Sequence, residues 1–239
     1  MRFAICNLVL LLMLTGCDDR KSTPAKPARV IEAAGSASVH GKVMLGGKAP
    51  VMAKIDNSIC THAGPIADET VLVDADGGLA NVLVSIAGVR SPADIPAAVV
   101  ELDQKDCRFV PHVVAVRAGQ PLRIKNSDAE AHNVHANPAA NASFNVALTV
   151  PGSSKNMTFT EAEVFRVKCD VHPWMACYVG VFDSEYFAVT DVAGRFKIKG
   201  LPPGSYELVA WHERYGELKQ TIEVSNGPIE ANFAYEPPK

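Results

Sequence analysis

Hydrophobic residues recur in short runs along most of the chain, and many of these runs alternate with polar residues. Examples are "VHGKVML", "VFRVKC", "RFKIKG", "SYELVAWH" and "LKQTIEV". A period of two predicts strands that bury one face. Turn signals separate the later runs, at Asp191–Gly194, Pro202–Gly204 and Asn226–Gly227. Because no segment carries the long, capped apolar stripe of an amphipathic helix, we predict an all-β fold.

The N-terminal stretch "MRFAICNLVLLLMLTGC" combines one early positive charge, an apolar run and small residues before a cysteine. This layout predicts an export signal over residues 1–16, and the run is too short for a membrane-spanning helix. Leu14–Cys17 resembles a lipobox, which implies that Cys17 carries a lipid; the alternative is an ordinary export signal with a chance cysteine. Asp18 resembles an inner-membrane retention signal. We therefore expect a lipid-anchored protein in the periplasm, where disulfides persist.

Residues 17–36 are polar, contain two prolines and show no periodicity, which predicts a flexible tether behind the lipid-bearing Cys17. The formal net charge of the whole chain is −3, and no basic patch stands out. This balance gives no support for a nucleic-acid partner.

The segment "TDVAGRFKIKGLPPGSYEL" resembles the recurrent core of the carboxypeptidase-regulatory or transthyretin-like sandwich. In that family a strand pair usually comes shortly before this core. Here the matching stretches "HGKVMLGGKAP" and "LANVLVSIAGV" lie far upstream. We therefore expect a smaller transthyretin-like β-sandwich in two parts, residues 37–95 and 184–237, with another domain at 97–183 inserted between them. Two sequential domains are the alternative.

The stretch "CDVHPWM" places Cys169, His172 and Met175 within seven residues, and His132 follows "KNSDAEA" further upstream. A blue copper centre needs one thiolate, two imidazoles and a weak axial thioether, and the chain supplies these groups in a suitable order. Zinc is the competing metal, although Met is a poor zinc ligand. A binuclear copper centre would need two cysteines in C-x3-C spacing, which is absent. His135 is the alternative to His132, but strand alternation places the two on opposite faces.

These residues lie within a wider resemblance to the cupredoxin, or blue copper, family. "RFVPHVVAVRAGQPLRIKNSDAEAHNV" is similar to its strand pattern, and "CDVHPWM" has the C-x2-H-P-aromatic-M spacing of the amicyanin-type ligand loop, related to that of plastocyanin. The resemblance implies a Greek-key β-sandwich with one type 1 copper ion. The implied ligands are His132, Cys169, His172 and Met175, and Asn133 is implied to tie the two ligand loops together. The same layout followed by the transthyretin-like module occurs in periplasmic proteins of the "methylamine utilisation" type.

Three more cysteines follow Cys17 outside the proposed ligand set. We predict a disulfide between Cys60 and Cys107, because both lie in strand-like or loop segments away from the metal motif. Cys177 is then an inert thiol buried on the strand after the ligand loop.

The resulting hypothesis is a one-electron carrier and not an enzyme, because no catalytic constellation stands out. His172 is expected at an exposed edge as the electron port, with Pro173 and Trp174 forming an apolar docking patch. The expected partner is a redox protein, either a dehydrogenase or a cytochrome. The alternatives are a copper-binding or delivery protein without redox shuttling, and a structural envelope module.

Overall fold

The computed structural model describes residues 28–32, 34–57, 60, 64–92 and 94–237. The predicted signal peptide, the lipidation site Cys17 and Asp18 lie outside these residues. Within the described part of the chain every regular element is a β-strand, so the prediction of an all-β fold is confirmed. No helix in these ranges is long and apolar enough to cross a membrane.

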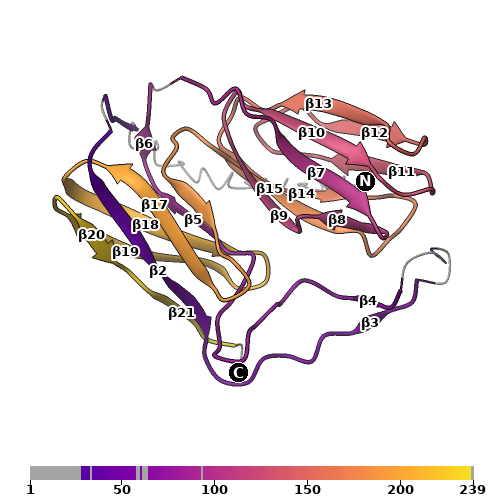
Figure 1. Ribbon diagram of the computed structural model, residues 1–239, viewed down its shortest axis with the longest axis horizontal. Helices are drawn as coiled ribbons and strands as arrows, with labels where there is room; N and C mark the ends of the chain where they lie inside the picture. The colour runs from indigo at the N-terminus through magenta and orange to yellow at the C-terminus, as the bar shows by residue number, and fades with distance from the viewer. Residues whose placement is uncertain (1–27, 33, 58–59, 61–63, 93, 238–239) are drawn as a thin grey trace, which may run out of the picture.

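Two β-sandwiches lie next to each other (Figure 1), and the first, which we call the inserted sandwich, contains β7 to β15. Its sheets have the strand orders β13-β10-β7-β8 and β12-β11-β14-β15-β9. The β7–β10 and β9–β15 pairs are parallel and the other pairs are antiparallel. The strands are β7 (Val100–Lys105), β8 (Arg108–Val110), β9 (Val113–Arg117), β10 (Pro121–Asn126), β11 (His132–Ala136), β12 (Phe144–Leu148), β13 (Ser154–Thr158), β14 (Glu163–Lys168) and β15 (Ala176–Phe182).

The second sandwich, which we call the host sandwich, contains strands from both sides of the inserted one. One sheet has the order β16-β5-β18-β19, and the other has the order β17-β2-β20, with β21 also pairing with β2. Its strands are β2 (Ala37–Leu45), β5 (Leu83–Ile86), β16 (Phe187–Val189), β17 (Arg195–Leu201), β18 (Gly204–His212), β19 (Gly216–Val224), β20 (Pro228–Glu230) and β21 (Phe233–Tyr235). Since β2 and β5 pair with strands that follow β15, the inserted sandwich interrupts the host sandwich in sequence.

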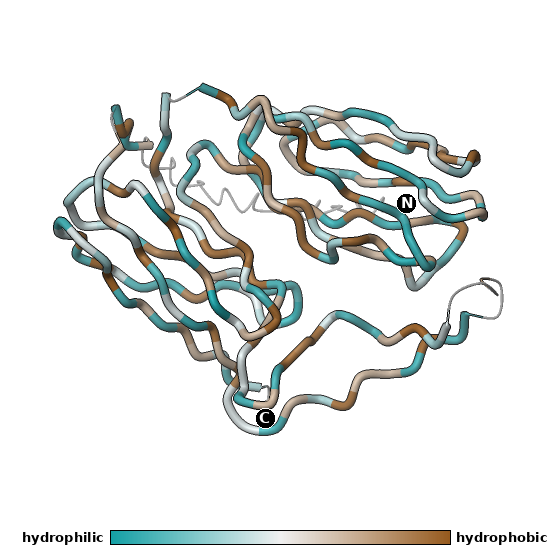
Figure 2. Tube along the Cα trace, in the orientation of Figure 1, coloured by the Kyte–Doolittle hydropathy of each residue, from teal (hydrophilic) through white to brown (hydrophobic). Residues whose placement is uncertain are grey.

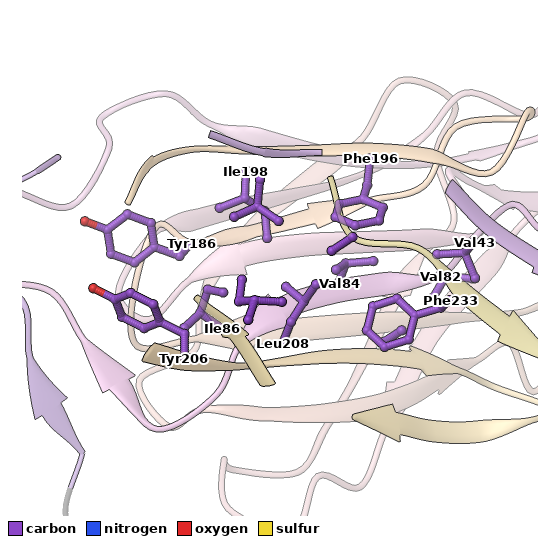
Figure 3. Close-up of a cluster of buried hydrophobic side chains, with 14 of the residues drawn as sticks. Val43, Val82, Val84, Ile86, Tyr186, Phe196, Ile198, Tyr206, Leu208 and Phe233 are labelled. Carbon is purple, nitrogen blue, oxygen red and sulfur yellow. The ribbon is translucent and has the colours of Figure 1, made fainter. Parts of the chain in front are cut away.

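Each sandwich has its own hydrophobic core, built by alternating side chains. Along β17, Phe196 and Ile198 are buried while the lysines beside them are exposed. Figure 3 shows these two residues packing with Tyr186, Tyr206 and Leu208 between the two sheets of the host sandwich. In the inserted sandwich a separate cluster contains buried hydrophobic residues of β10, β14 and β15. Figure 2 shows hydrophobic positions interrupted by hydrophilic ones along the strands of both sandwiches.

A long connection between β2 and β5 leaves the host sandwich and reaches the inserted one. We call its described residues, 53–57, 60 and 64–70, the arm; it contains β3 (Lys54–Ile55) and β4 (Ile66–Ala67), which pair antiparallel. Figure 1 shows this hairpin well away from the host strands. Cys60 forms a disulfide with Cys107, which lies just before β8, and Glu69 pairs with Arg108 at 3.0 Å. Ile66 is buried in the core cluster of the inserted sandwich. The arm is therefore covalently and hydrophobically attached to that domain.

The end of the predicted tether is packed against the host sandwich. β1 (Arg29–Val30) pairs in parallel with β6 (Val89–Arg90), and the Ile31 amide donates to the Arg90 carbonyl at 2.9 Å. Ile31 itself is buried in the host core. Residues 29–31, which we expected in the tether, are thus ordered by backbone pairing and by one apolar side chain that a search for periodicity does not detect.

Polar and aromatic contacts join the two sandwiches. The buried Arg117 of β9 donates to the Glu185 carboxylate at 3.1 Å and to the Ser91 carbonyl at 3.1 Å. His112 contacts Glu213 of the host sandwich, and the rings of Tyr178 and Trp211 meet edge to face. These side-chain contacts orient the inserted sandwich on its host.

Candidate metal centre

The four predicted ligand residues come from one end of the inserted sandwich. His132 begins β11, Cys169 directly follows β14, and His172 and Met175 lie on the short loop before β15. Two backbone hydrogen bonds close this loop: the Cys169 amide donates to the Met175 carbonyl at 3.1 Å, and the Met175 amide donates to the His172 carbonyl at 2.9 Å. The short spacing of the motif thus forms a compact turn that brings Met175 next to Cys169.

Three donor atoms of these residues converge in a buried space. The Nδ1 atoms of His132 and His172 lie 3.0 Å apart, and the Cys169 sulfur lies 3.8 Å from Nδ1 of His172. The exposed fractions of His132, Cys169 and His172 are 1%, 2% and 2%. Ligand atoms about 2 Å from a common metal ion lie roughly 3–4 Å from one another. The separations and the thiolate and imidazole chemistry therefore fit a single metal ion.

Met175 supplies the fourth group expected on the loop. Its side chain is 1% exposed and packs in the same core cluster as Cys169. A thioether is a soft, weak donor, so Met175 would add a weak ligand to the stronger thiolate and imidazole donors if a metal ion were bound.

Asn133 and Asp170 connect the two ligand segments. The Asn133 side-chain oxygen accepts the Asp170 amide at 2.6 Å and lies 3.3 Å from the Cys169 sulfur. Its side-chain nitrogen donates to the Asp170 carboxylate at 2.8 Å. Asn133 thus lies where it can hold the cysteine loop against β11, the role implied by the family resemblance.

The surroundings of Cys169 favour the thiolate. Burial by itself raises the pKa of this thiol, but a hydrogen bond with His132 and backbone amides from the loop outweigh it, so the pKa is below its usual value. For His132, burial lowers the pKa, and hydrogen bonds with Cys169 and Asp128 raise it, with a net rise. Hydrogen bonds from Lys168, Asn133 and His135 hold the pKa of Asp170 well below its ordinary range.

His135 and Cys177, the two competing side chains, lie outside the cluster. Nδ1 of His135 lies 2.8 Å from the Asp170 carboxylate, on the partly exposed side of the loop. Cys177 is a fully buried free thiol on β15, and burial raises its pKa strongly. His135 lies on the strand face opposite His132, and the Cys177 sulfur is not among the donor atoms that converge in the described part of the chain.

The prediction that His172 lies at an exposed edge is wrong. His172 is buried, because Trp174 and the disulfide pack around it: the ring centroids of His172 and Trp174 are 5.3 Å apart, and the ligand atoms of Cys60, Cys107 and His172 lie within 4.8 Å of one another. Trp174 is half-buried and donates its indole N–H to the Cys107 carbonyl at 3.0 Å. Of the predicted docking patch, Pro173 is therefore exposed and Trp174 only partly so.

Asp128 is a functional candidate that the sequence reasoning missed. Its carboxylate lies 2.9 Å from Nε2 of His132, on the side of the ring opposite the convergent donors. The only sequence signal was an acid four residues before a candidate ligand, a pattern too common to single out.

Comparison with known proteins agrees with this architecture. Residues 96–182 match the model of the copper-binding plastocyanin/azurin family. With the two-sheet topology, this match supports a cupredoxin-like fold for the inserted sandwich, in agreement with the sequence resemblance. A search of curated proteins found no match.

Several solved structures are similar to this part of the chain. Amicyanin from Paracoccus versutus is 23% identical, with a TM-score of 0.33, and the match covers 41% of this chain and 97% of amicyanin. A purple cupredoxin from Nitrosopumilus maritimus is 19% identical, with a TM-score of 0.31, and the match covers 35% of this chain and 99% of that one. A copper-containing nitrite reductase from Thermus scotoductus is 19% identical, with a TM-score of 0.35. That match covers 40% of this chain and only 25% of the reductase.

Proposed function

We propose that this protein is a one-electron carrier that holds a single type 1 copper ion in the inserted sandwich. The observation that carries the proposal is the buried convergence of His132, Cys169 and His172 inside a cupredoxin-like domain. When bound, copper supplies a one-electron couple between Cu(II) and Cu(I).

The chain's own residues prepare the site for this task. His132, Cys169 and His172 supply the strong donors, and Met175 supplies the weak one. Backbone bonds across the loop and the Asn133 side chain fix these donors independently of any ion. Because the donors are held in one arrangement, the reorganisation energy is small when an electron arrives or leaves. Its burial keeps water and competing ligands away from the centre.

Electron exchange does not require a substrate pocket, and we propose no catalytic turnover. Val171 and Pro173 are the exposed neighbours of His172 on the ligand loop. A redox protein partner, a dehydrogenase or a cytochrome, would approach the centre at these residues.

Export and a lipid on Cys17 would place the carrier at the periplasmic face of a membrane, with Asp18 favouring the inner membrane. Loss of lipid labelling and membrane association in Cys17→Ala would support this placement, whereas unchanged labelling would contradict it.

The optical spectrum of the copper-loaded full chain tests the proposal. An intense visible thiolate-to-copper band is expected for the wild type and should be lost in Cys169→Ser. Cys177→Ser is the matched control: it removes the other free buried thiol of this domain, outside the donor cluster, and should keep the band. A colourless copper-bound wild type would overturn the proposal, as would preferential binding of zinc.

Voltammetry separates an electron carrier from a delivery protein. A carrier shows a reversible one-electron wave and keeps its copper through repeated cycles. Release of copper on reduction would favour delivery instead.

A further inference from the structure

Asp128 places a carboxylate directly behind one of the proposed copper ligands. One of its oxygens, Oδ2, lies 2.9 Å from Nε2 of His132, while Nδ1 of the same ring faces His172. Both side chains are almost completely buried, with exposed fractions of 3% and 0% for Asp128 and His132. The contact is therefore shielded from water, where an electrostatic interaction is much stronger than at the surface.

The turn between β7 and β8 holds this carboxylate in place. The Asp106 amide donates to Oδ1 of Asp128 at 2.7 Å, and the Cys107 amide donates to Oδ2 at 2.9 Å. Asp106 and Cys107 have φ values of 53° and 52°, in the left-handed region that non-glycine residues rarely adopt. Two successive amides are thereby directed at one carboxylate, an arrangement that binds an anion. The disulfide to Cys60 fixes the same turn.

This arrangement selects one tautomer of His132. Because both Asp128 oxygens already accept backbone amides, the carboxylate acts as the acceptor toward the ring, and Nε2 carries the hydrogen. Nδ1 then keeps its lone pair, directed into the space shared with Cys169 and His172. Hydrogen bonds to the remote nitrogen of a ligating histidine generally orient the ring and raise its basicity as a ligand.

Resting on the proposed function, we infer that Asp128 is the positioning residue that biases the copper centre toward its oxidised form. It fixes the His132 tautomer and places a buried negative charge behind that ligand. The charge stabilises Cu(II) more than Cu(I), because the oxidised ion carries one more positive charge. Asp128 thus lowers the reduction potential of the site without contacting the metal.

Asp128→Asn is the direct test, in the full-length protein. The wild type should bind Cu(II) about 10–100-fold more tightly than this variant, and Cu(I) affinity should fall less. Each tenfold fall in the ratio of Cu(II) affinity to Cu(I) affinity raises the reduction potential by about 59 mV. Chelator competition gives the two dissociation constants, and spectroelectrochemical titration gives the potential independently.

Asp106→Asn is the matched control. It removes one negative charge from the same turn, retains the amide that donates to Asp128, and places there a residue that tolerates a positive φ. In Asp106→Asn, the ratio of Cu(II) affinity to Cu(I) affinity should stay within twofold of the wild-type ratio. If Asp128→Asn does not fold, Asp128→Ser replaces it, because Ser is small, uncharged and able to accept one of the two amides.

A readout without copper separates this inference from the proposed function. In the metal-free protein, ¹⁵N chemical shifts of the imidazole should show His132 with its hydrogen on Nε2, and the folded Asp128 variant should lose this preference. An unchanged tautomer, or an affinity ratio within twofold of the wild type, would overturn the role of Asp128. A wild type that binds copper without the visible band would overturn the carrier function instead, and the tautomer result would still decide whether Asp128 orients His132.

Discussion

The side chain of Asn133 joins two segments of the chain that lie far apart in sequence: its oxygen accepts the backbone amide of Asp170 at 2.6 Å. The same side chain also donates to the Asp170 carboxylate and to Asn145. The side-chain amide of the residue after one ligand therefore holds the residue after another.

Asn133→Ala removes this connection. The free energy of unfolding should fall by about 1–3 kcal/mol, because a partly buried amide and a carboxylate lose their partner. Copper affinity should fall with it, since the cysteine loop is no longer held against β11. Chemical denaturation and chelator competition measure the two effects. The exposed Asn156, whose side-chain oxygen accepts from Arg123 at 3.4 Å, provides the control: Asn156→Ala should change stability by no more than about 0.5 kcal/mol.

Met175→Leu tests the proposed role of Met175 as a weak copper ligand. The substitution nearly conserves volume, so the loss of stability should stay below about 1.5 kcal/mol. The visible band should persist, and the reduction potential should rise, because the oxidised ion loses a donor and gains an apolar neighbour. Met157→Leu changes a second methionine of the same domain, which is partly buried, and its potential should match that of the wild type. A potential unaffected by Met175→Leu would exclude Met175 as a ligand.

The double variant Cys60→Ser/Cys107→Ser tests the cover over His172. The disulfide closes a loop with a sequence separation of 47, so its removal should lower the free energy of unfolding by about 4 kcal/mol. The arm should then detach more readily and expose His172, which diethyl pyrocarbonate labelling followed by mass spectrometry would detect. Cys177→Ser should leave His172 protected. Equal protection in the double variant would show that Trp174 and the loop suffice to cover the ring.

His212 makes stability depend on pH in the mildly acidic range. Burial lowers its pKa from 6.5 to about 4. The unfolded chain therefore binds the proton more readily between these values, so the stability contribution is complete above pH 6.5 and is lost as the pH falls toward 4. The loss should reach up to about 3 kcal/mol at 1.36 kcal/mol per pKa unit.

His212→Leu should flatten this part of the stability profile, measured by chemical denaturation at several pH values. His40→Leu, which removes an exposed histidine of the same sandwich, serves as the control and should retain the wild-type slope. The same slope in His212→Leu would contradict the assignment.

Local pattern was sufficient to predict the strands and the compact ligand loop. Hydrophobic and charged residues alternate around Phe196 and Ile198, and this alternation predicts which side chains the strand buries. The spacing of Cys169, His172 and Met175 sets a turn too short to adopt many shapes, and two backbone bonds close it. β2 and β5 pair with strands that follow the inserted sandwich, so two stretches of the chain with matching strand patterns build the host sandwich.

Contacts between distant segments could not be predicted in the same way. The burial of His172 depends on Cys60, which an arm from the host sandwich brings against the inserted domain. The packing of Ile31 depends on pairing between β1 and β6. Neither feature leaves a periodic signal, because each involves one or two residues whose partners are far away in sequence.

The sequence by itself determined the all-β class, the cupredoxin-like pattern and the group of candidate donors, because these follow from side-chain period, turn chemistry and short spacing. Only the tertiary structure decided that His172 is covered and that Asp128 supports His132. Both depend on how the β7–β8 turn, the arm and the ligand loop meet in space. A buried charge or a covered imidazole is a property of its surroundings, and these surroundings exist only once the chain has folded.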